Sequence, residues 1–598
     1  MAPKIYTSSL PYPPLVHRSV FTHLFASSTG SPEDVGGYPS RTIAFIDAAS
    51  GTSMTRGQLK HWALSLAYGL KHHPNTAPHA KRGDTIMIYS HNSFVWPVVV
   101  FGSVAAGLRC TLANNAYNAR ELAFQYTDSG AKLIFVSEGG VATARQTLKD
   151  LGFSKEEADK RIIVLPESLA WAGGPDVPRK PELAGLLAAP DLLKLGTLKE
   201  EEKFEGPELS KETVYLCYSS GTTGKPKGVE TTHRNFTSVM NMVTAGIQVN
   251  TEHDLMLGFL PFYHIYGAAK LLHWPFTLGV PVAIMTRFDP EAFCANVEKY
   301  KVTICLVVPP VLVVLSRHPA VDKHDLSSLE ILISGAAPLG AELSNAVIDR
   351  LQPKRGRKGP LKILQGYGLT ETSPTTHLVT PAKAAEKLGT IGVQLPHLEI
   401  RLVVDGDGDG LIDAAEGEPG ELWIRGPSIM KGYLNNPTAT QDSITSDGWF
   451  KTGDIGTRDP EGFYRIVDRR KELIKYKGFQ VPPAELEGVL LTHPEIADAA
   501  VIGIESAKEA TELPRAYIVH ANPNALKTET DKVAFALNVQ NWIRSKVAHH
   551  KFLRGGVVVI DAIPKSAAGK ILRRELRERA KEELAGRDPA DDIVKAKL

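Results

Sequence analysis

The sequence contains few cysteines, no long apolar run and almost no net charge. Its four cysteines, among 598 residues, include no CxxC pair, which argues against a disulfide framework and a structural zinc site and fits a reducing compartment. Basic residues (68) nearly balance acidic residues (66), so no overall field attracts nucleic acid or an anionic membrane. The most membrane-like stretch, residues 302–315, holds two prolines in 14 residues and is too short to span a bilayer. We therefore expect no nucleic-acid partner and no transmembrane segment.

Strand-like and helix-like patterns alternate along most of the chain. The β-branched runs "TIMIYS", "KLIFV" and "RIIVL" alternate with stretches such as "RGQLKHWALSLAYGLKHH", whose apolar residues recur at helical spacing. This alternation is typical of an α/β fold, in which helices cross over between the strands of a sheet. Residues 169–209 are rich in Leu, Ala, Pro and Lys with weak periodicity, and we predict a covering segment or linker there.

The character of the sequence changes near Asp468. Beyond it, short strand-like runs flank one helical stretch near residues 533–547, which predicts a small α+β unit of about 130 residues. We therefore divide the chain into an N-terminal domain, residues 1–468, and a C-terminal domain, residues 469–598.

The stretch "DGDGDGLIDAAE", residues 405–416, matches the calcium-loop pattern of EF-hand proteins at every position. An EF-hand loop lies between two helices, whereas "LEIRLVV" before this loop and "GELWIRG" after it are strand-like. Gly and Asp are also what a long turn between strands requires. We therefore predict a hairpin connection, with a non-catalytic Ca²⁺ site as the alternative.

A loop rich in Gly, Ser and Thr, "SSGTTGKPKG" at residues 219–228, follows the strand-like run "VYLCY" and precedes a helix expected to begin near His233. Its backbone N–H groups, its hydroxyls and its lysines, Lys225 and Lys227, suit a polyphosphate. The loop lacks the GK[ST] ending of the Walker pattern. Taken alone, such a loop is more often an exposed turn, so its assignment depends on the motifs downstream.

Further motifs follow the loop in a fixed order: "SGAAPLG", "QGYGLTET", "WFKTGD", "DRRKELIKYKGFQVPPAELE" and "PKSAAGKILRREL". Their order, spacing and wording resemble the adenylate-forming superfamily of acyl-CoA synthetases, firefly luciferases and nonribosomal-peptide adenylation domains, and most closely its 4-coumarate:CoA ligase branch. The runs "ELAFQYTDSGAKLIFV" and "LPFYHIYG" extend the resemblance over nearly the whole chain. It implies a large N-terminal domain of α/β subdomains with a small β-barrel-like part, followed by a small mobile α+β C-terminal domain.

The resemblance also implies an ATP-dependent acid:CoA ligase that forms AMP. A carboxylic acid would attack the α-phosphate of ATP to give acyl-AMP and pyrophosphate, and the thiol of CoA would then displace AMP. Because charge develops on the transferring phosphate, catalysis would depend on positioning and electrostatics. Two alternatives share the adenylation motifs: luciferase-like oxygenation of the acyl-AMP, and a stand-alone adenylation enzyme that uses no CoA.

By the same resemblance, one set of residues binds the nucleotide. Tyr367 would offer its ring to adenine opposite Ala336 and Ala337, and Asp454 and Arg469 would bind the ribose hydroxyls. The whole ATP/AMP-binding set that the resemblance implies is Ser219, Ser220, Gly221, Thr222, Thr223, Gly224, Lys227, Ala336, Ala337, Gln365, Gly366, Tyr367, Gly368, Thr370, Asp454, Arg469, Lys471, Gln480 and Lys570.

Four residues are expected to be catalytic. Lys570, in "SAAGK", would neutralise the carboxylate and the α-phosphate during adenylation. Glu371 would hold Mg²⁺ beside the phosphates, and Thr370 would donate a hydrogen bond. His264 would gate the acyl pocket or contact the acyl end, although a lone histidine in an apolar stretch could equally be a core residue.

The acid substrate is expected to be of the aryl or cinnamic type, or a medium-chain acid. Plant coumarate ligases have a small hydroxyl residue where Lys270 stands and a lysine where Ile333 stands, so recognition of a para-hydroxyl does not transfer. On a helix Lys270 would share a face with Tyr266, and we hypothesise that it reaches the distal end of the acid and prefers a polar or anionic group there, the alternative being a snorkelling lysine. The implied acyl pocket comprises His264, Tyr266, Lys270, Ile333, Ala336, Gly368, Pro374 and Thr375.

The C-terminal domain is expected to serve both half-reactions by swinging about a hinge at Lys471. The resemblance implies that the CoA arm is bound by Lys475, Lys477, Gly478 and Phe479. Gly478 lacks a side chain at the point where the arm would pass. The chain ends in Ala596-Lys597-Leu598, a conservative variant of the Ser-Lys-Leu peroxisomal address, so we expect the peroxisomal import receptor as a partner, with a cytoplasmic location as the alternative.

Overall fold

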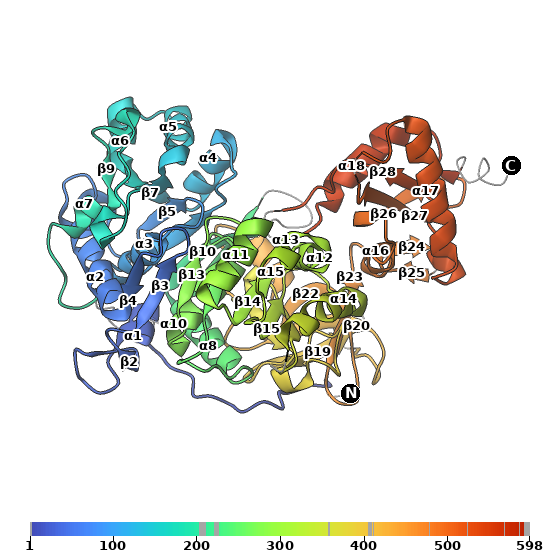
Figure 1. Cartoon of the computed structure of the whole chain (residues 1–598), viewed down its shortest axis with the longest axis horizontal. Coiled ribbons are helices and arrows are strands. Elements are labelled where there is room, and N and C mark those ends of the chain that lie inside the picture. Colours follow the sequence, from blue (N-terminus) through green and yellow to red (C-terminus); the bar gives the residue numbers. More distant parts are fainter. Residues whose placement is uncertain are drawn as a thin grey trace.

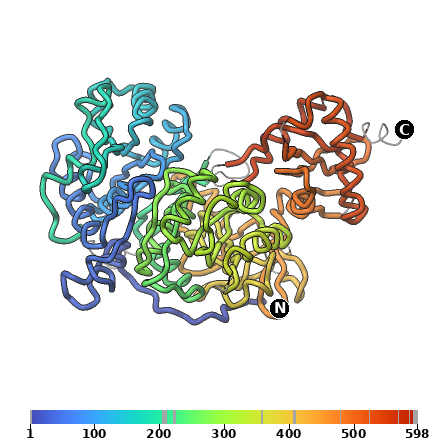
Figure 2. The backbone as a smooth tube through the Cα atoms, viewed as in Figure 1, coloured from blue at the N-terminus to red at the C-terminus, as the bar shows by residue number. Residues whose placement is uncertain are grey.

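The computed structural model describes residues 3–202, 211–219, 226–356, 359–404, 410, 412–477, 479–522, 524–566, 569–584 and 586–590. Figure 1 shows a large part that holds most of the chain and a smaller part, drawn in orange to red, set to one side. The N-terminal segment runs along the large part in Figure 2, and near its start Tyr6 forms a β-bridge with Ile400 of the strand Glu399–Val403. The predicted α/β fold with a small C-terminal domain is confirmed.

The first sheet has helices on both faces. Ile86 and Ile88 lie in the core under one pair of helices, whereas their neighbours Met87 and Tyr89 lie in the core under the other pair, because successive strand residues point to opposite faces. The pairs are α2 (Arg56–His72) with α3 (Trp96–Ala105), and α4 (Ala119–Asp128) with α5 (Val141–Asp150). In spatial order the strands are β21 (Gly432–Tyr433), β11 (Lys227–Thr232), β10 (Thr213–Ser219), β6 (Arg109–Ala113), β5 (Thr85–Tyr89), β7 (Ala131–Ser137), β8 (Ile162–Leu165) and β9 (Leu187–Ala188).

The second sheet is parallel in its middle. Its strands in spatial order are β18 (Val393–Gln394), β17 (Thr375–Leu378), β16 (Lys362–Gly368), β15 (Ile331–Ser334), β14 (Ile304–Val307), β12 (Met256–Gly258), β13 (Val282–Ile284), β3 (Ile43–Asp47) and β4 (Ser53–Thr55). The run from β16 to β3 is parallel throughout, so the carboxyl ends of β14, β15 and β16 meet at one edge. Ligands bind at such edges of open α/β sheets.

Shorter elements and helices cover these two sheets. They are α1 (Val20–Phe25), α6 (Lys155–Arg161), α7 (Ala189–Leu193), α8 (His233–Thr244), α9 (Ile265–Gly267), α10 (Trp274–Leu278), α11 (Pro290–Tyr300), α12 (Pro309–Arg317), α13 (Ala320–Lys323), α14 (Ala341–Leu351) and α15 (Pro437–Ser443). Residues 169–202 are a covering segment rather than a free linker, since they supply the edge strand β9 and helix α7, which packs on α2. Residues 203–210 lie outside the described residues.

A third, antiparallel sheet of four strands stands where a β-barrel-like part was expected. Its strands are β19 (Glu399–Val403), β20 (Gly420–Arg425), β22 (Phe450–Arg458) and β23 (Tyr464–Arg469). The division predicted between residues 468 and 469 therefore falls inside β23, whose last residue is Arg469.

The EF-hand pattern joins β19 to β20, so the prediction that strands flank it is confirmed. Two of its would-be ligands already have basic partners. Asp413 accepts from the Nε of Arg401 at 2.9 Å and from the backbone N–H of Lys4. Glu416 pairs with the ammonium of Lys4 at 2.9 Å and with Arg458 at 3.1 Å. The loop positions 405–409 and 411 lie outside the described residues.

The C-terminal domain has a hydrophobic core of its own. Arg573 links its elements, with Nη1 at 2.8 Å from Glu472 and Nη2 at 2.7 Å from Glu487. The predicted helix near residues 533–547 begins earlier, at Glu529, because Thr528 and Asp531 form a capping box. The domain contains the hairpin β24 (Ile474–Tyr476) and β25 (Phe479–Val481), the sheet β26 (Ile496–Ser506), β27 (Thr511–His520) and β28 (Val557–Val559), and the helices α16 (Pro483–Leu490), α17 (Glu529–Arg544) and α18 (Arg573–Leu584).

Within the described residues, no helix combines the length and the apolar character that crossing a membrane requires.

Candidate active site

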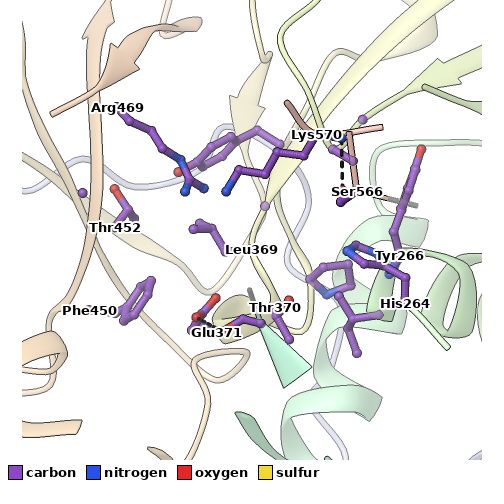
Figure 3. Close-up of a pocket in the computed structure, with 18 of the residues that line it drawn as sticks. His264, Tyr266, Leu369, Thr370, Glu371, Phe450, Thr452, Arg469, Ser566 and Lys570 are labelled. Carbon is purple, nitrogen blue, oxygen red and sulfur yellow. Dashed lines mark hydrogen bonds between the residues drawn. The ribbon is translucent and has the colours of Figure 1, made fainter. Parts of the chain in front are cut away.

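A cavity of about 1430 Å³ opens at the carboxyl edge of β14 to β16 and extends to the C-terminal domain. Its wall includes the ends of β10 and β16, the turn after β15, strand β22 and the loop that carries Lys570. Figure 3 shows Lys570 and Arg469 pointing into this space from one side, with Glu371 and Thr370 across from them. The motifs that lie far apart in the sequence thus share one cavity.

Tyr367, Asp454 and Arg469 form a connected group at one side of the cavity. The hydroxyl of Tyr367 donates to Oδ2 of Asp454 at 2.5 Å, and Nε of Arg469 lies 3.3 Å from Oδ1. Burial, followed by the charge of Asp454, raises the pKa of Tyr367 well above its usual value, so its hydroxyl stays a donor. A carboxylate with both oxygens held in this way is oriented to accept from neighbouring hydroxyls such as those of a ribose.

Two residues on the cavity wall near Tyr367 have special backbone requirements. A side chain at Gly368 would meet the carbonyl oxygen of Pro374 at 1.9 Å, so only glycine fits. Ala336 adopts a left-handed φ of +67°, a strained conformation for a residue other than glycine and one that is common at ligand sites.

Glu371 lies in the 3₁₀ turn Thr370–Thr372 that follows β16. Its Oε1 accepts from the hydroxyl of Ser219 at 3.0 Å and from that of Tyr433 at 2.9 Å. In the part of the chain that the structure describes, Oε2 accepts no hydrogen bond and the carboxylate pairs with no basic side chain. An oriented carboxylate with one unengaged oxygen at a cavity wall fits a hard divalent cation such as Mg²⁺.

Lys570 enters from the C-terminal domain. Its backbone N–H donates to the hydroxyl of Ser566 at 3.2 Å, and the neighbouring Gly569 lies against Pro310 of the N-terminal domain, where a β-carbon would be 3.5 Å from the proline ring. Burial, followed by the charge of Arg469, lowers the pKa of the Lys570 ammonium to about 8. The side chain therefore remains largely protonated near neutral pH and is held where it can meet an anion.

His264 precedes a short helix and accepts at Nδ1 from the backbone N–H of Tyr266, at 3.2 Å. Burial, with a smaller contribution from Lys570, lowers the pKa of His264 to about 4, so the ring is neutral near pH 7. With Nδ1 accepting, the proton lies on Nε2, which makes that atom a donor. The ring of Tyr266 lies against Gly335, and its hydroxyl donates to the carbonyl of Ile333 at 3.0 Å.

Tyr266 and Lys270 lie on two helical segments of different type. Tyr266 belongs to α9, and Lys270 belongs to the π-helix Ala268–His273 that follows it, so one regular α-helix does not join the two residues. Both side chains nevertheless line the cavity. Lys270 is only 5% exposed, with its Nζ 5.3 Å from the centroid of the Trp274 ring.

Most of the residues implied by the resemblance lie on the wall of this single cavity. Three described residues of the implied nucleotide-binding set do not line it: Ala337, Gln365 and Asp454. Asp454 lies directly behind the wall, where it accepts a hydrogen bond from the cavity-lining Tyr367. Ser220 to Gly224, Lys225 and Gly478 lie outside the described residues. The expected residues that line the cavity are Ser219, Lys227, His264, Tyr266, Lys270, Ile333, Ala336, Gly366, Tyr367, Gly368, Thr370, Glu371, Pro374, Thr375, Arg469, Lys471, Lys475, Gln480 and Lys570.

Two residues expected to bind CoA point elsewhere in this arrangement of the domains. Lys477 pairs with Glu509 at 2.6 Å, and the ring of Phe479 stacks on His550 with centroids 4.6 Å apart. Their neighbours Lys475 and Gln480, which are paired across the β24–β25 hairpin, do line the cavity.

Sequence reasoning missed several residues of the cavity wall. The hydroxyl of Tyr433, in "KGYLNN", donates to Glu371, and the Nζ of Lys227 lies over its ring, 4.0 Å from the centroid. Thr452 lies inside the quoted motif "WFKTGD", where its hydroxyl accepts from the backbone N–H of Asp454 at 3.0 Å. Thr452 could have been predicted from its place in this motif. Tyr433 could not, because only the fold brings it to the carboxylate of Glu371.

The fold and the cavity define a two-domain α/β protein whose large cavity is lined by lysine, arginine and carboxylate side chains from both domains. The AMP-binding enzyme family matches residues 32–434, and the AMP-binding enzyme C-terminal domain matches residues 485–570. The chain is 37% identical over 545 residues to 4-coumarate–CoA ligase 1 of Petroselinum crispum, covering 89% of this chain and 90% of that protein. It is 43% identical over 370 residues to probable 4-coumarate–CoA ligase 1 of Dictyostelium discoideum, covering 62% of this chain and 63% of that protein's length.

A solved structure of o-succinylbenzoate CoA synthetase from Bacillus subtilis, in complex with ATP and magnesium ion, is also similar. It has 25% sequence identity and a TM-score of 0.69, and the match covers 94% of this chain and 99% of that one. The chain belongs to the AMP-binding enzyme family, since the family match spans more than half of its length. The resemblance to adenylate-forming enzymes, and to the 4-coumarate:CoA ligase branch among them, is confirmed.

Proposed function

We propose that this chain is an ATP-dependent acid:CoA ligase that forms AMP. The observation that carries the proposal is the meeting of Lys570, from the C-terminal domain, with Glu371 and the Tyr367–Asp454 pair in one cavity. A cation can meet the α-phosphate, a carboxylate can hold a metal ion beside the phosphates, and a second carboxylate can accept from the ribose hydroxyls. Together these groups can position a nucleoside triphosphate for attack at its α-phosphorus. The relatives named as CoA ligases support the same reaction class.

In the first half-reaction, an oxygen of the substrate carboxylate attacks the α-phosphorus of ATP. A bond forms between that oxygen and phosphorus, the bond to the bridging oxygen of the β-phosphate breaks, and pyrophosphate leaves. Lys570 offsets the negative charge that two anions bring together, and the Nε2–H of His264 donates toward the incoming acid. In the second, the CoA sulfur attacks the acyl carbon, the carbon–oxygen bond to AMP breaks, AMP leaves, and the thiol proton passes to solvent.

Glu371 would hold Mg²⁺, and the ion would supply charge neutralisation at the phosphates. Its carboxylate is oriented for this by the hydroxyls of Ser219 and Tyr433, which both donate to Oε1. The Mg²⁺- and ATP-bound structure of a relative supports this assignment.

CoA is the proposed acceptor of the acyl group. Lys475 and Gln480, side by side on the β24–β25 hairpin, bring a cation and an amide to the cavity wall, and both groups can meet phosphates. Lys477, Gly478 and Phe479 stay assigned to CoA by the family resemblance. We place their contacts in the second arrangement of the domains, reached by rotation near Lys471.

The acid is proposed to be an aryl, cinnamic-type or medium-chain acid. Apolar side chains line much of the inner cavity, including Ile247, Leu306 and Ile333. The Petroselinum crispum relative is named for 4-coumarate, and activation of such acids in phenylpropanoid or fatty-acid metabolism fits this wall. Neither Lys270 nor Ile333 follows the coumarate pattern.

AMP release with a panel of acids, measured with and without CoA, tests the proposed function. We expect AMP and an acyl-CoA thioester in equal amounts, each dependent on both acid and CoA. Light emission with a luciferin, or AMP release that CoA does not accelerate, would instead favour luciferase-like oxygenation or a stand-alone adenylation enzyme.

Import into peroxisomes through Ala596-Lys597-Leu598 is a separate proposal. These residues lie outside the described residues, and the proposal rests on their likeness to the peroxisomal address. Fusion of residues 587–598 to a fluorescent reporter tests it. Punctate fluorescence that coincides with a peroxisomal marker is expected, and diffuse cytosolic fluorescence would contradict it.

A further inference from the structure

Lys270 is a buried cation on the cavity wall. Only 5% of the residue is exposed, and its Nζ lies 5.3 Å from the centroid of the Trp274 ring. Within the described residues its ammonium forms no ion pair and no hydrogen bond. This distinguishes it from Lys570, whose surroundings include Arg469, Asp454 and Glu472.

The surroundings of Lys270 are apolar. The indole N–H of Trp274 donates to Thr244 at 3.3 Å, which places Lys270 beside the end of α8, and Gly246 just beyond it contacts Leu378 of β17. Side chains from these elements line the same cavity: Val243, Ile247, Trp274 and Leu378. The lysine thus stands beside apolar side chains on the cavity wall.

No neighbouring group neutralises Lys270. The π-helix itself carries His273, and the elements packed against it carry Tyr266 on α9 and His233 and Arg234 at the N-terminal end of α8, with Tyr215 on β10 and His377 on β17 beyond them. Burial lowers the pKa of His273 and of His377 to about 3, so both rings are neutral, and the hydroxyl of Tyr215 is bonded to His273 at 2.7 Å. Burial alone lowers the pKa of Lys270 to about 7.

A snorkelling lysine does not account for this arrangement. Snorkelling places the ammonium in bulk water while the stem covers apolar surface, but here only 5% of the residue is exposed and it faces the cavity rather than the outer surface. An isolated buried charge costs free energy unless an opposite charge or several hydrogen bonds meet it. Within the described chain the missing partner can come only from what fills the cavity.

We propose that Lys270 binds a second carboxylate at the far end of the substrate, so that the enzyme prefers acids with an anionic group at both ends. This inference rests on the proposed function, because it names the substrate class of the same cavity. One carboxylate meets Lys570 at the reacting end, and the other meets Lys270 among apolar walls. A neutral distal group would fill the same space but leave the ammonium unpaired.

Two pairs of acids test the proposal: the members of the first match in shape and differ in distal charge, and those of the second match in chain length. One pair is para-carboxycinnamate and para-nitrocinnamate, and the other is an aliphatic dicarboxylic acid and the monocarboxylic acid with the same number of carbon atoms. We expect the wild-type kcat/KM for AMP release to be about 10²-fold higher for the charged member of at least one pair. Equal values, or a preference for the neutral member in both pairs, would overturn the proposal.

The variant Lys270→Met removes the charge and keeps the length of the side chain. The ratio of kcat/KM between the charged and the neutral acid should fall about 10²-fold in this variant. Lys299→Met is the matched control, because the Nζ of Lys299 lies 4.7 Å from the centroid of the Tyr300 ring and outside the cavity. Its ratio should equal that of the wild type.

The outcomes separate this inference from the proposed function. If no acid supports AMP release, the proposed function fails. If acids are activated but Lys270→Met leaves the ratio unchanged, only the inference about Lys270 fails. The wild-type comparison needs no variant and stands even if Lys270→Met does not fold.

Discussion

The hydroxyl of Tyr367, at the end of the parallel sheet, donates to Oδ2 of Asp454, in the antiparallel sheet, at 2.5 Å. The contact joins two motifs separated by 87 positions and leaves the tyrosine ring on the cavity wall. One residue thus offers a face for a base while its hydroxyl orients the acceptor for the ribose. Binding of the nucleotide should therefore depend on this hydroxyl as well as on the ring.

Tyr367→Phe keeps the ring and removes this hydrogen bond. A hydrogen bond to a charged group contributes about 1.5–3 kcal/mol, so KM for ATP should rise about tenfold or more, while KM for the acid changes little. Tyr300→Phe is the control, because its hydroxyl donates to the carbonyl of Ala48 at 2.9 Å, outside the cavity. A KM for ATP that is equal in both variants would show that the Tyr367–Asp454 bond does not act on the nucleotide.

Lys570→Ala should separate the two half-reactions. Loss of a preorganised cation at the developing charge should slow formation of acyl-AMP by about 10²–10³-fold, whereas supplied acyl-AMP and CoA should still give the thioester. Pyrophosphate release and thioester formation measure the two steps. Lys565→Ala, in the same loop but paired with Asp498 at 2.6 Å, is the control and should leave both steps unchanged. Equal losses in both steps for Lys570→Ala would contradict a role limited to adenylation.

Arg317 should help to hold the C-terminal domain in the arrangement that places Lys570 in the cavity. From the end of α12 it donates to the backbone carbonyls of Ile496 at 2.7 Å and Leu491 at 3.0 Å. Arg317→Ala should slow adenylation about tenfold and spare thioester formation. Arg350→Ala removes bonds within the N-terminal domain only and controls for general destabilisation. If Arg317→Ala slowed adenylation and thioester formation equally while Arg350→Ala slowed neither, Arg317 would not favour the adenylation arrangement over the other.

Removal of the charge at Lys270 should stabilise the protein in a pH-dependent way. Burial lowers the pKa of Lys270 from 10.5 to about 7, so the folded state disfavours the proton that the unfolded state binds. The penalty is fully present below about pH 7 and is lost as the pH rises toward 10.5. Lys270→Met should therefore unfold with a free energy about 1–4 kcal/mol higher than the wild type at low pH, and the gap should narrow as the pH rises. Denaturant unfolding at about pH 6 and about pH 9 measures it, and a gap that is equal at both pH values would contradict the buried cation.

Short motifs made much of this site predictable, because phosphate, ribose and metal each demand particular atoms in a particular local conformation. Gly368 is an example, since the carbonyl of Pro374 leaves no room for a side chain. The strands around the EF-hand pattern were also predictable, because alternation of β-branched residues is a local signal.

Other features depend on contacts that the sequence does not display. The π-helix at Ala268–His273, which packs against α8 and α10, was not predictable, because the spacing of apolar residues over six positions does not distinguish it from an α-helix. The hydrogen bond from Tyr433 to Glu371 joins residues 62 positions apart. The isolation of Lys270 likewise follows only from which side chains the fold places around it.

Transfer of oxygen from the acid to AMP tests the central claim most directly. If the substrate carboxylate attacks the α-phosphorus, an acid labelled in its carboxylate with a heavy oxygen isotope must leave one labelled oxygen in the AMP, because CoA attacks the acyl carbon and the bridging oxygen departs with phosphorus. Mass spectrometry of the AMP formed in the presence of acid, ATP and CoA measures this. We predict one labelled oxygen in each AMP, together with an equal amount of acyl-CoA. Unlabelled AMP, or label that appears in a phosphate released with ADP, would contradict the account.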